Sequence, residues 1–217
     1  MVDAPGRSSP RFPPEKVGVV RRAIRERLKA LQVGYGFSSA ARGSDLIFVE
    51  ELLNRGGHAS VFLPFPKEDF ARTSVGDDWK DRYKKVLADG KVEVTELSAE
   101  FPPGEKQPDA YLACSAEVHR AAIALAKLLD EEPVLVTVWN GNPGDERGGT
   151  ADAVRAWEQE GYKVEMIDIS KLKVQSEAAA SRIFISYRRD DSSGHTGRLL
   201  DWLTERFEQD LIFRDLE

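Results

Sequence analysis

Short apolar segments alternate with amphipathic segments along most of this chain, and that alternation limits the fold more than any other feature. Gly and Pro bound the apolar segments, and the segments between them carry apolar residues three or four positions apart. Such alternation predicts an α/β fold with a parallel sheet and helices on both faces. Strands are predicted at Ala59–Phe65, Lys91–Thr95, Pro133–Trp139 and Lys163–Ile169, and helices near Pro14–Leu31, Leu46–Leu53, Asp78–Ala88, Asp109–Leu129 and around Val154 and Trp157.

The pattern divides the chain into four parts. Residues 1–14 are rich in Pro and predict an irregular segment, and residues 15–170 form the parallel-sheet domain. Residues 171–181 have three Ala and mixed charge and predict a linker or a weak helix. Residues 182–217 contain an apolar run at Ile183–Ile185, then helical spacing, then a second apolar run around Ile212. This last part predicts a strand-helix-strand unit.

Composition excludes several classes of function. The 217 residues are 41% hydrophobic and 31% charged, as in ordinary globular proteins. The net charge of −6 disfavours a nucleic-acid partner. The basic cluster of Arg21, Arg22, Arg25, Arg27 and Lys29 is interpreted as the solvated face of a helix. A single cysteine, Cys114, allows no disulfide framework. No apolar run is long enough to cross a membrane, so we expect no membrane partner and a cytoplasmic location.

Two glycine-rich turns each precede a predicted helix. Backbone amides at a helix N-terminus favour anions, and glycine lets a ligand approach the backbone closely. In parallel sheets such turns lie at the carboxyl ends of the strands, where ligands bind. A purely structural role, as tight connections, is the open alternative. The candidate ligand-binding residues are Gly34, Gly36, Ser38, Ser39, Arg42, Gly43 and Asp45 in the first turn and Trp139, Gly148, Gly149, Thr150 and Asp152 in the second.

Both turns resemble those of the SLOG superfamily. The resemblance rests on Ser38–Asp45 with the strand Val61–Pro64, and on Trp139–Gly141 with Gly148–Asp152. It implies a Rossmann-like domain that senses a nucleotide-derived ligand, such as ADP-ribose or a cyclic ADP-ribose isomer. The superfamily also includes phosphoribohydrolases, whose catalytic glutamate would fall on Ala153 here. Relatives with the Phe12-Pro13 stretch usually carry one more strand before Asp3.

The final segment resembles the opening of a bacterial TIR domain. The resemblance rests on Phe184–Asp191, on Gly197-Arg198-Leu199 and on Ile212–Asp215, in the family's order. It implies an incomplete TIR domain; the family's catalytic glutamate lies later in the fold, and no residue here matches it. We therefore assign no catalytic residue. The TIR strand and loop residues are Phe184, Ser186, Tyr187 and Arg188.

Together the two resemblances imply a signalling protein of bacterial immunity or NAD-linked signalling. The SLOG-like domain would sense the ligand, and a complete TIR domain would cleave NAD or assemble with other TIR domains or with itself. One alternative is a nucleotide phosphoribohydrolase with a TIR scaffold. In another, neither part is catalytic and the TIR domain only recruits other TIR domains.

The histidines and the cysteine suggest no further site. His58, His119 and His195 do not have metal-ligand spacing, so no metal is predicted. His119 is predicted to lie on the surface of a long helix. Cys114 has no activating base nearby in the sequence, and we interpret it as a packing residue.

Overall fold

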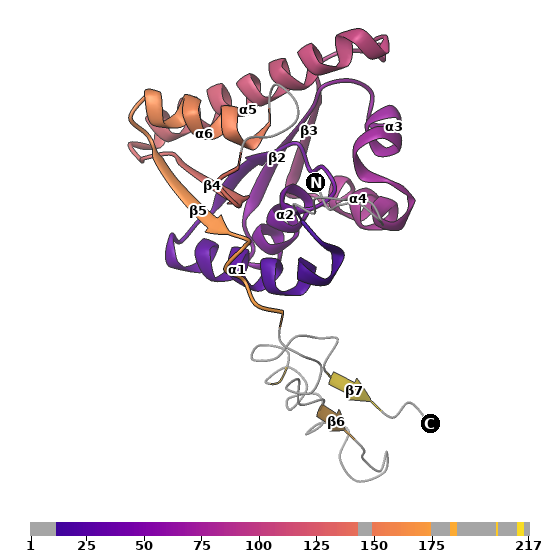
Figure 1. Ribbon diagram of the computed structural model, residues 1–217, viewed down its shortest axis with the longest axis vertical. Coiled ribbons are helices and arrows are strands. Elements are labelled where there is room, and N and C mark those ends of the chain that lie inside the picture. Colours follow the sequence, from indigo (N-terminus) through magenta and orange to yellow (C-terminus); the bar gives the residue numbers. More distant parts are fainter. Residues whose placement is uncertain (1–11, 143–148, 175–182, 186–202, 204–211, 215–217) are drawn as a thin grey trace. The chain divides into compact units, whose positions relative to one another are not determined.

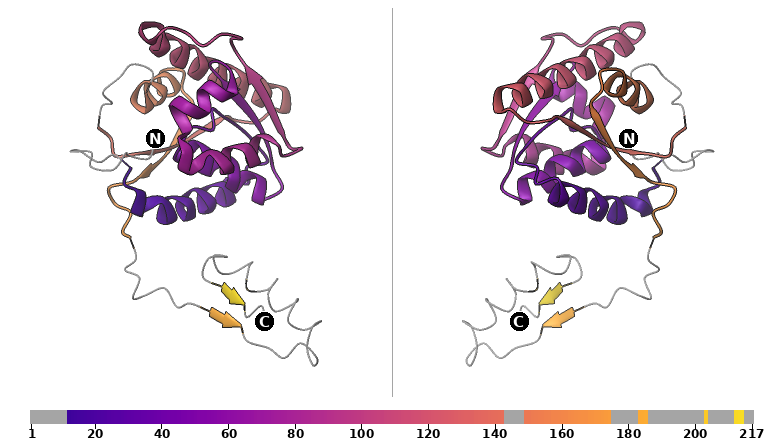
Figure 2. Two further views of the ribbon diagram at one scale, coloured as in Figure 1. Left: turned by 90° about the vertical axis from the view of Figure 1, so that its right-hand side faces the viewer. Right: turned by 90° about the vertical axis from the view of Figure 1, so that its left-hand side faces the viewer.

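The computed structural model describes residues 12–142, 149–174, 183–185, 203 and 212–214. The chain divides into two compact units, Met1–Lys173 and Val174–Glu217, and each is described by itself (Figures 1 and 2). In the first unit the helices of four or more residues are α1 (Val17–Ala30), α2 (Ser44–Asn54), α3 (Lys67–Phe70), a π-helical segment (Ala71–Val75), α4 (Lys80–Leu87), α5 (Gln107–Leu129) and α6 (Thr150–Gln159). Its strands are β1 (Tyr35–Ser38), β2 (His58–Leu63), β3 (Val92–Glu96), β4 (Val134–Trp139) and β5 (Lys163–Asp168).

All strand pairs are parallel, which confirms the predicted α/β class and is consistent with a Rossmann-like fold. The strands form two hydrogen-bonded sheets in place of the single sheet expected, one in the order β1-β2-β3 and one of β4 and β5. Tyr35 is opposite His58 in the first sheet, and Val134 is opposite Lys163 in the second. The sheets are separate because β1 and β4 do not pair with each other.

Helices cover both faces of the strands. Figure 1 shows α5 and α6 above the strands and α1 below them. The helix α5 contacts β1 and β2, and α6 contacts β4 and β5. In the other layer α2 contacts β1 and β2, α4 contacts β3, and α1 contacts both α2 and β4. The helices α2 and α6 therefore lie over the strands that they join, whereas α5, which connects β3 to β4, lies over β1 and β2.

The strand β1 lies inside the segment that we expected to be one continuous turn, Gly34–Asp45. Its Gly and Ser residues hide the usual apolar signal of a strand. Gly36 is required there because α2 packs directly on the strand: a Cβ atom at this position would lie 2.6 Å from Cζ of Phe48. The turn proper is therefore shorter and begins after Ser38.

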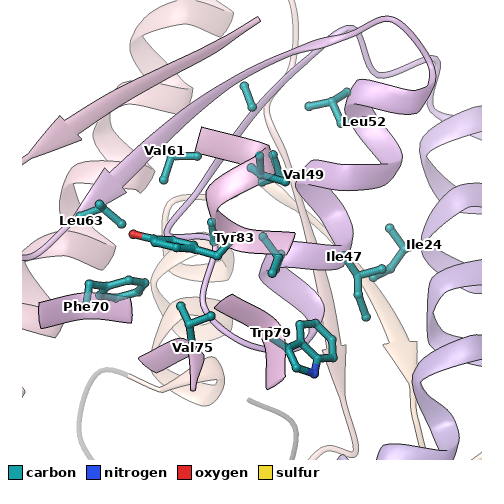
Figure 3. Packing of buried hydrophobic residues seen from close by; sticks show 14 of the residues in the cluster. Ile24, Ile47, Val49, Leu52, Val61, Leu63, Phe70, Val75, Trp79 and Tyr83 are labelled. Carbon is teal, nitrogen blue, oxygen red and sulfur yellow. The ribbon is translucent and has the colours of Figure 1, made fainter. Parts of the chain in front are cut away.

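The hydrophobic core of the first unit is built around α2 and β2. Figure 3 shows Val49 and Leu52 of α2 near Val61 of β2, and Tyr83 beside Phe70. These side chains are at most 2% exposed. Burying an aliphatic or aromatic side chain of this size contributes about 1.5–3 kcal/mol each. This region is the main source of apolar stabilisation in the unit.

A buried network of charges connects α1, α2 and α4. Glu51 is 1% exposed and accepts hydrogen bonds from Arg21 and Arg25, both at 2.7 Å. Glu50 accepts from Arg21 at 2.6 Å and from Arg82 at 2.7 and 2.6 Å. Burial alone raises the pKa of Glu50, but the hydrogen bonds and charges of Arg82 and Arg21 outweigh it and lower the pKa below its usual value. The interpretation of the basic cluster as a solvated face is therefore wrong for Arg21 and Arg25, since both bind the buried carboxylate of Glu51.

The second unit contains two short parallel strands, β6 (Ile183–Ile185) and β7 (Ile212–Arg214). Phe184 is opposite Phe213 in the register. Leu203, which lies between the two strands in the sequence, has a helical backbone and is buried. These observations agree with the predicted strand-helix-strand order. Ser186, Tyr187 and Arg188 lie outside the described residues.

Candidate functional site

One cavity of about 830 Å³ brings the two predicted turns together. Ser39 and Asp45 of the first turn line it, as do Gly149 and Thr150 of the second. Its volume falls within the range of small-molecule sites in proteins. Ser38 and Ser44 also line it, together with residues of β1, β4, α5 and α6.

The first turn holds a carboxylate at the N-terminus of α2. Ser39 Oγ donates to Asp45 at 3.0 Å, and Ser44 Oγ donates to it at 3.3 Å. Ala40 has a left-handed backbone (φ +54°), and its N–H donates to Ser38 Oγ at 3.2 Å. A left-handed non-glycine residue costs about 1–2 kcal/mol. The turn thus stores strain while it fixes Asp45 against the cavity.

The remaining residues of the first turn have structural roles. Gly43 precedes α2 with φ +113°, which requires glycine. The guanidinium of Arg42 lies 2.7 Å from Asp78 and does not line the cavity. Gly36 lies within β1 and Gly34 just before it, and both line the cavity. Gly34 is therefore at the amino end of the strand, away from the turn.

The second turn presents backbone and a hydroxyl to the cavity. Gly149 is the last residue before α6, and Thr150 is the first residue of the helix. Asp152 accepts a hydrogen bond from Arg155 at 3.1 Å and does not line the cavity. Trp139 donates its indole N–H to Asn142 O at 2.7 Å, which closes the turn instead of lining the cavity. Gly148 lies outside the described residues.

Residues of α5 and α6 that we did not predict also line the cavity. The His119 ring stacks on the Trp157 ring with centroids 4.7 Å apart, and both line the cavity. The His119 side chain is 14% exposed, so the predicted surface position is wrong. Tyr111, Cys114 and Val118 share this face of α5. Their three-to-four spacing is a signal in the sequence, but the sequence does not say what the face covers.

The chemistry of Cys114 is that of a packing residue. Burial, with smaller contributions from the charges of Asp45 and Glu117, raises the pKa of the thiol to about 12. Its Sγ donates to Phe62 O at 3.2 Å. A thiol with this pKa is protonated at neutral pH and is a poor nucleophile.

The described lining of the cavity is acidic at both ends. Asp45 lies near the turns, and Glu131 and Glu132 lie near the start of β4. Within the described ranges no Lys or Arg lines it, so a phosphate there would depend on backbone amides. The described residues contain no group of three or more metal-ligating side chains. They also contain no helix of the length and apolarity needed to span a membrane.

The lining of the cavity is suited to binding a ligand that carries hydroxyl groups and an anionic group. Asp45 can accept hydrogen bonds from hydroxyl groups, and the amides at the start of α6 can donate to an anion. Ala153, on the next turn of α6, places only a methyl group in the cavity. Comparison with family models, curated proteins and solved structures found no match to this chain.

Proposed function

We propose that the first unit senses a nucleotide-derived ligand, such as ADP-ribose or a cyclic ADP-ribose isomer, at the carboxyl ends of β1 and β4. The observation that supports this most is that both glycine turns line one cavity. The TIR-like segment belongs to the effector in this proposal. In a complete TIR domain the effector would cleave NAD or assemble with other TIR domains, as part of a cytoplasmic signalling system in bacterial defence.

The charges of the cavity suggest how such a ligand lies. A phosphate is repelled by Asp45 and attracted by the amides at Gly149 and Thr150, where the dipole of α6 also favours an anion. The Asp45 carboxylate, held by Ser39, is a natural acceptor for ribose hydroxyls. The ribose therefore belongs at α2 and the phosphates at α6.

Isothermal titration calorimetry with ADP-ribose, cyclic ADP-ribose isomers and common nucleotides tests the proposal. We expect Gly149→Asp to weaken binding by tenfold or more, about 1.4 kcal/mol, because the new carboxylate repels the phosphates. Gly104→Asp is the matched control, because a side chain at Gly104 meets nothing within 4 Å and this residue does not line the cavity. If no nucleotide binds, or if both variants behave alike, the sensor proposal is wrong.

Hydrolysis by the same cavity is the second candidate, and the structure favours it less. The position that corresponds to the phosphoribohydrolase glutamate is Ala153, which lines the cavity and has no acid-base group. We expect no base release from nucleoside monophosphates under conditions in which ADP-ribose binds. Release that is lost in Asp45→Asn would favour the enzyme over the sensor.

A further inference from the structure

The first turn carries two opposite charges that the fold keeps apart. Arg42 is the one basic residue of this turn, and it lies three residues before Asp45. A single loop encloses both residues, because the N–H of Leu46 donates to Ala41 O at 3.1 Å. Asp45 lines the cavity, whereas Arg42 does not line it and pairs with Asp78 instead.

The fold holds Arg42 against Asp78 by several contacts. The guanidinium lies 2.7 Å from the Asp78 carboxylate, and the Arg42 side chain is only 20% exposed. The backbone N–H of Arg42 donates to Ser74 O at 2.9 Å. Gly76 leaves the space for the pair, since a Cβ atom there would lie 3.3 Å from both Arg42 Nη1 and Asp78 Oδ1. The chain around Gly76 therefore keeps Arg42 on its own side of the turn.

The residue after Asp78 fixes the position of this carboxylate. Trp79 is 7% exposed, and the guanidinium of Arg82 lies over its ring, 3.7 Å from the centroid. Arg82 also donates to Glu50 of α2, at 2.7 and 2.6 Å. Asp78 is therefore anchored to the same helix whose first turn carries Asp45.

The pair is nevertheless weak enough for one substitution to release Arg42. The Asp78 side chain is 55% exposed, and ion pairs with an exposed partner contribute little to stability. The Nε atom of Arg42 is buried and has no hydrogen-bond partner in the described part of the chain, so Asp78 does not satisfy the whole guanidinium. Without Asp78, the same turn offers Arg42 the carboxylate of Asp45.

We propose that Asp78 determines the specificity of the cavity at α2, because it withholds Arg42 from Asp45. The inference rests on the proposed function, in which Asp45 accepts hydrogen bonds from ribose hydroxyls. A carboxylate without a counterion accepts from hydroxyls and repels phosphates, whereas an arginine at the same place binds phosphates. The partner of Arg42 thus decides whether this end of the cavity takes a free ribose or a phosphorylated one.

Two nucleotides with a single ribose, AMP and adenosine 2′,5′-bisphosphate, test the proposal by isothermal titration calorimetry. In Asp78→Ala the released Arg42 should weaken the binding of AMP and strengthen that of the bisphosphate, by about fivefold each. Arg42→Ala in the same chain should restore the preference for AMP. Asp69→Ala is the matched control, because it removes the same charge from an exposed pair with Arg72 and neither residue lines the cavity. This control should leave the preference unchanged.

The preference between the two nucleotides separates this role from a structural one. If Asp78 only supports the fold, Asp78→Ala weakens both nucleotides alike, and Arg42→Ala does not restore the preference. Either result would overturn the proposal. So would an equal change of preference in Asp69→Ala, because the cause would then be the net charge of the chain.

A measurement without ligand keeps this inference separate from the proposed function. We expect Asp45→Asn to lower Tm by about 2 °C more in the Asp78→Ala chain than in the wild-type chain, because there it breaks a new pair with Arg42. Arg42→Ala should abolish this excess. Equal losses of Tm in the two chains would contradict the inference even if nucleotides bind. If ADP-ribose and both mononucleotides fail to bind, the proposed function is wrong, but the excess would still show that Asp78 withholds Arg42 from Asp45.

Discussion

The two sheets of the first unit differ in how well their apolar residues are buried. Around β2 and α2, Val61, Leu63 and Leu52 are fully buried. In β4 the apolar residues Leu135 and Val136 are only half-buried, and Thr137 is the one residue of that strand that is buried. The strand β4 is as apolar as β2, so composition does not explain the difference. What differs is the pairing among the described residues: β2 pairs along both of its edges, and β4 pairs along one.

Matched leucine substitutions should show the largest contrast between the sheets. Leu52→Ala removes a side chain that packs on Gly36 and Gly57, and we expect it to lower the free energy of unfolding by about 4 kcal/mol. Leu135→Ala in β4 should cost about 1 kcal/mol, because its side chain is already partly solvated. Urea denaturation of both variants measures the difference. Equal losses would mean that β4 is as well buried in solution as the region of β2 and α2.

Removing a buried carboxylate of α2 should lower the stability more than removing a carboxylate of β5 whose partners are exposed. Glu51→Ala leaves Arg21 and Arg25 without their buried partner, and we expect a loss of about 3 kcal/mol in the free energy of unfolding. Glu165→Ala in β5 removes pairs with Arg27 and Lys163, whose side chains are 40% and 53% exposed, and should cost clearly less than Glu51→Ala. Chemical denaturation of the two variants separates them. A larger loss for Glu165 would reverse the comparison.

Removing a buried hydroxyl should have the smallest effect and the opposite sign. Tyr83 Oη is buried and has no hydrogen-bond partner in the described part of the chain, and burial raises the pKa of this phenol. Tyr83→Phe should therefore raise the free energy of unfolding by about 1 kcal/mol. Tyr111→Phe is the control, since it breaks a 2.7 Å hydrogen bond with Ser74 and should lower stability by a similar amount. A destabilised Tyr83→Phe would indicate a partner for the hydroxyl.

Local patterns in the sequence predicted the elements with strong periodicity. The apolar runs of β2 and β4 and the long helix α5 lie within one or two residues of their expected positions. The strand β1 was missed because Gly36 and Ser38 carry no apolar signal, although the packing of Phe48 on Gly36 makes glycine necessary. The evidence for this strand is its contact with α2, a helix that follows it in the sequence.

Features that depend on distant residues could not be predicted from the sequence. The pairing of Arg21 with Glu50 and Glu51 joins two helices and is invisible to a local pattern. The two turns were predicted as candidates, and the structure brings Asp45 and Gly149 to one cavity. The sequence could not show that Arg42 binds Asp78 or that Trp139 closes its own turn, because both depend on side-chain direction.

The position of Cys114 provides a natural reporter for motion of α5. The thiol is buried against β2 by its hydrogen bond to Phe62 O, and it is the only thiol in the chain. The side chain is only 3% exposed, but it also lines the cavity, so a thiol reagent can reach it from the cavity as well as when α5 moves away from β2. The labelling rate therefore reports both access to the cavity and opening of its wall, without any added probe. A ligand that fills the cavity should slow this labelling, and substitutions that loosen α5 should accelerate it.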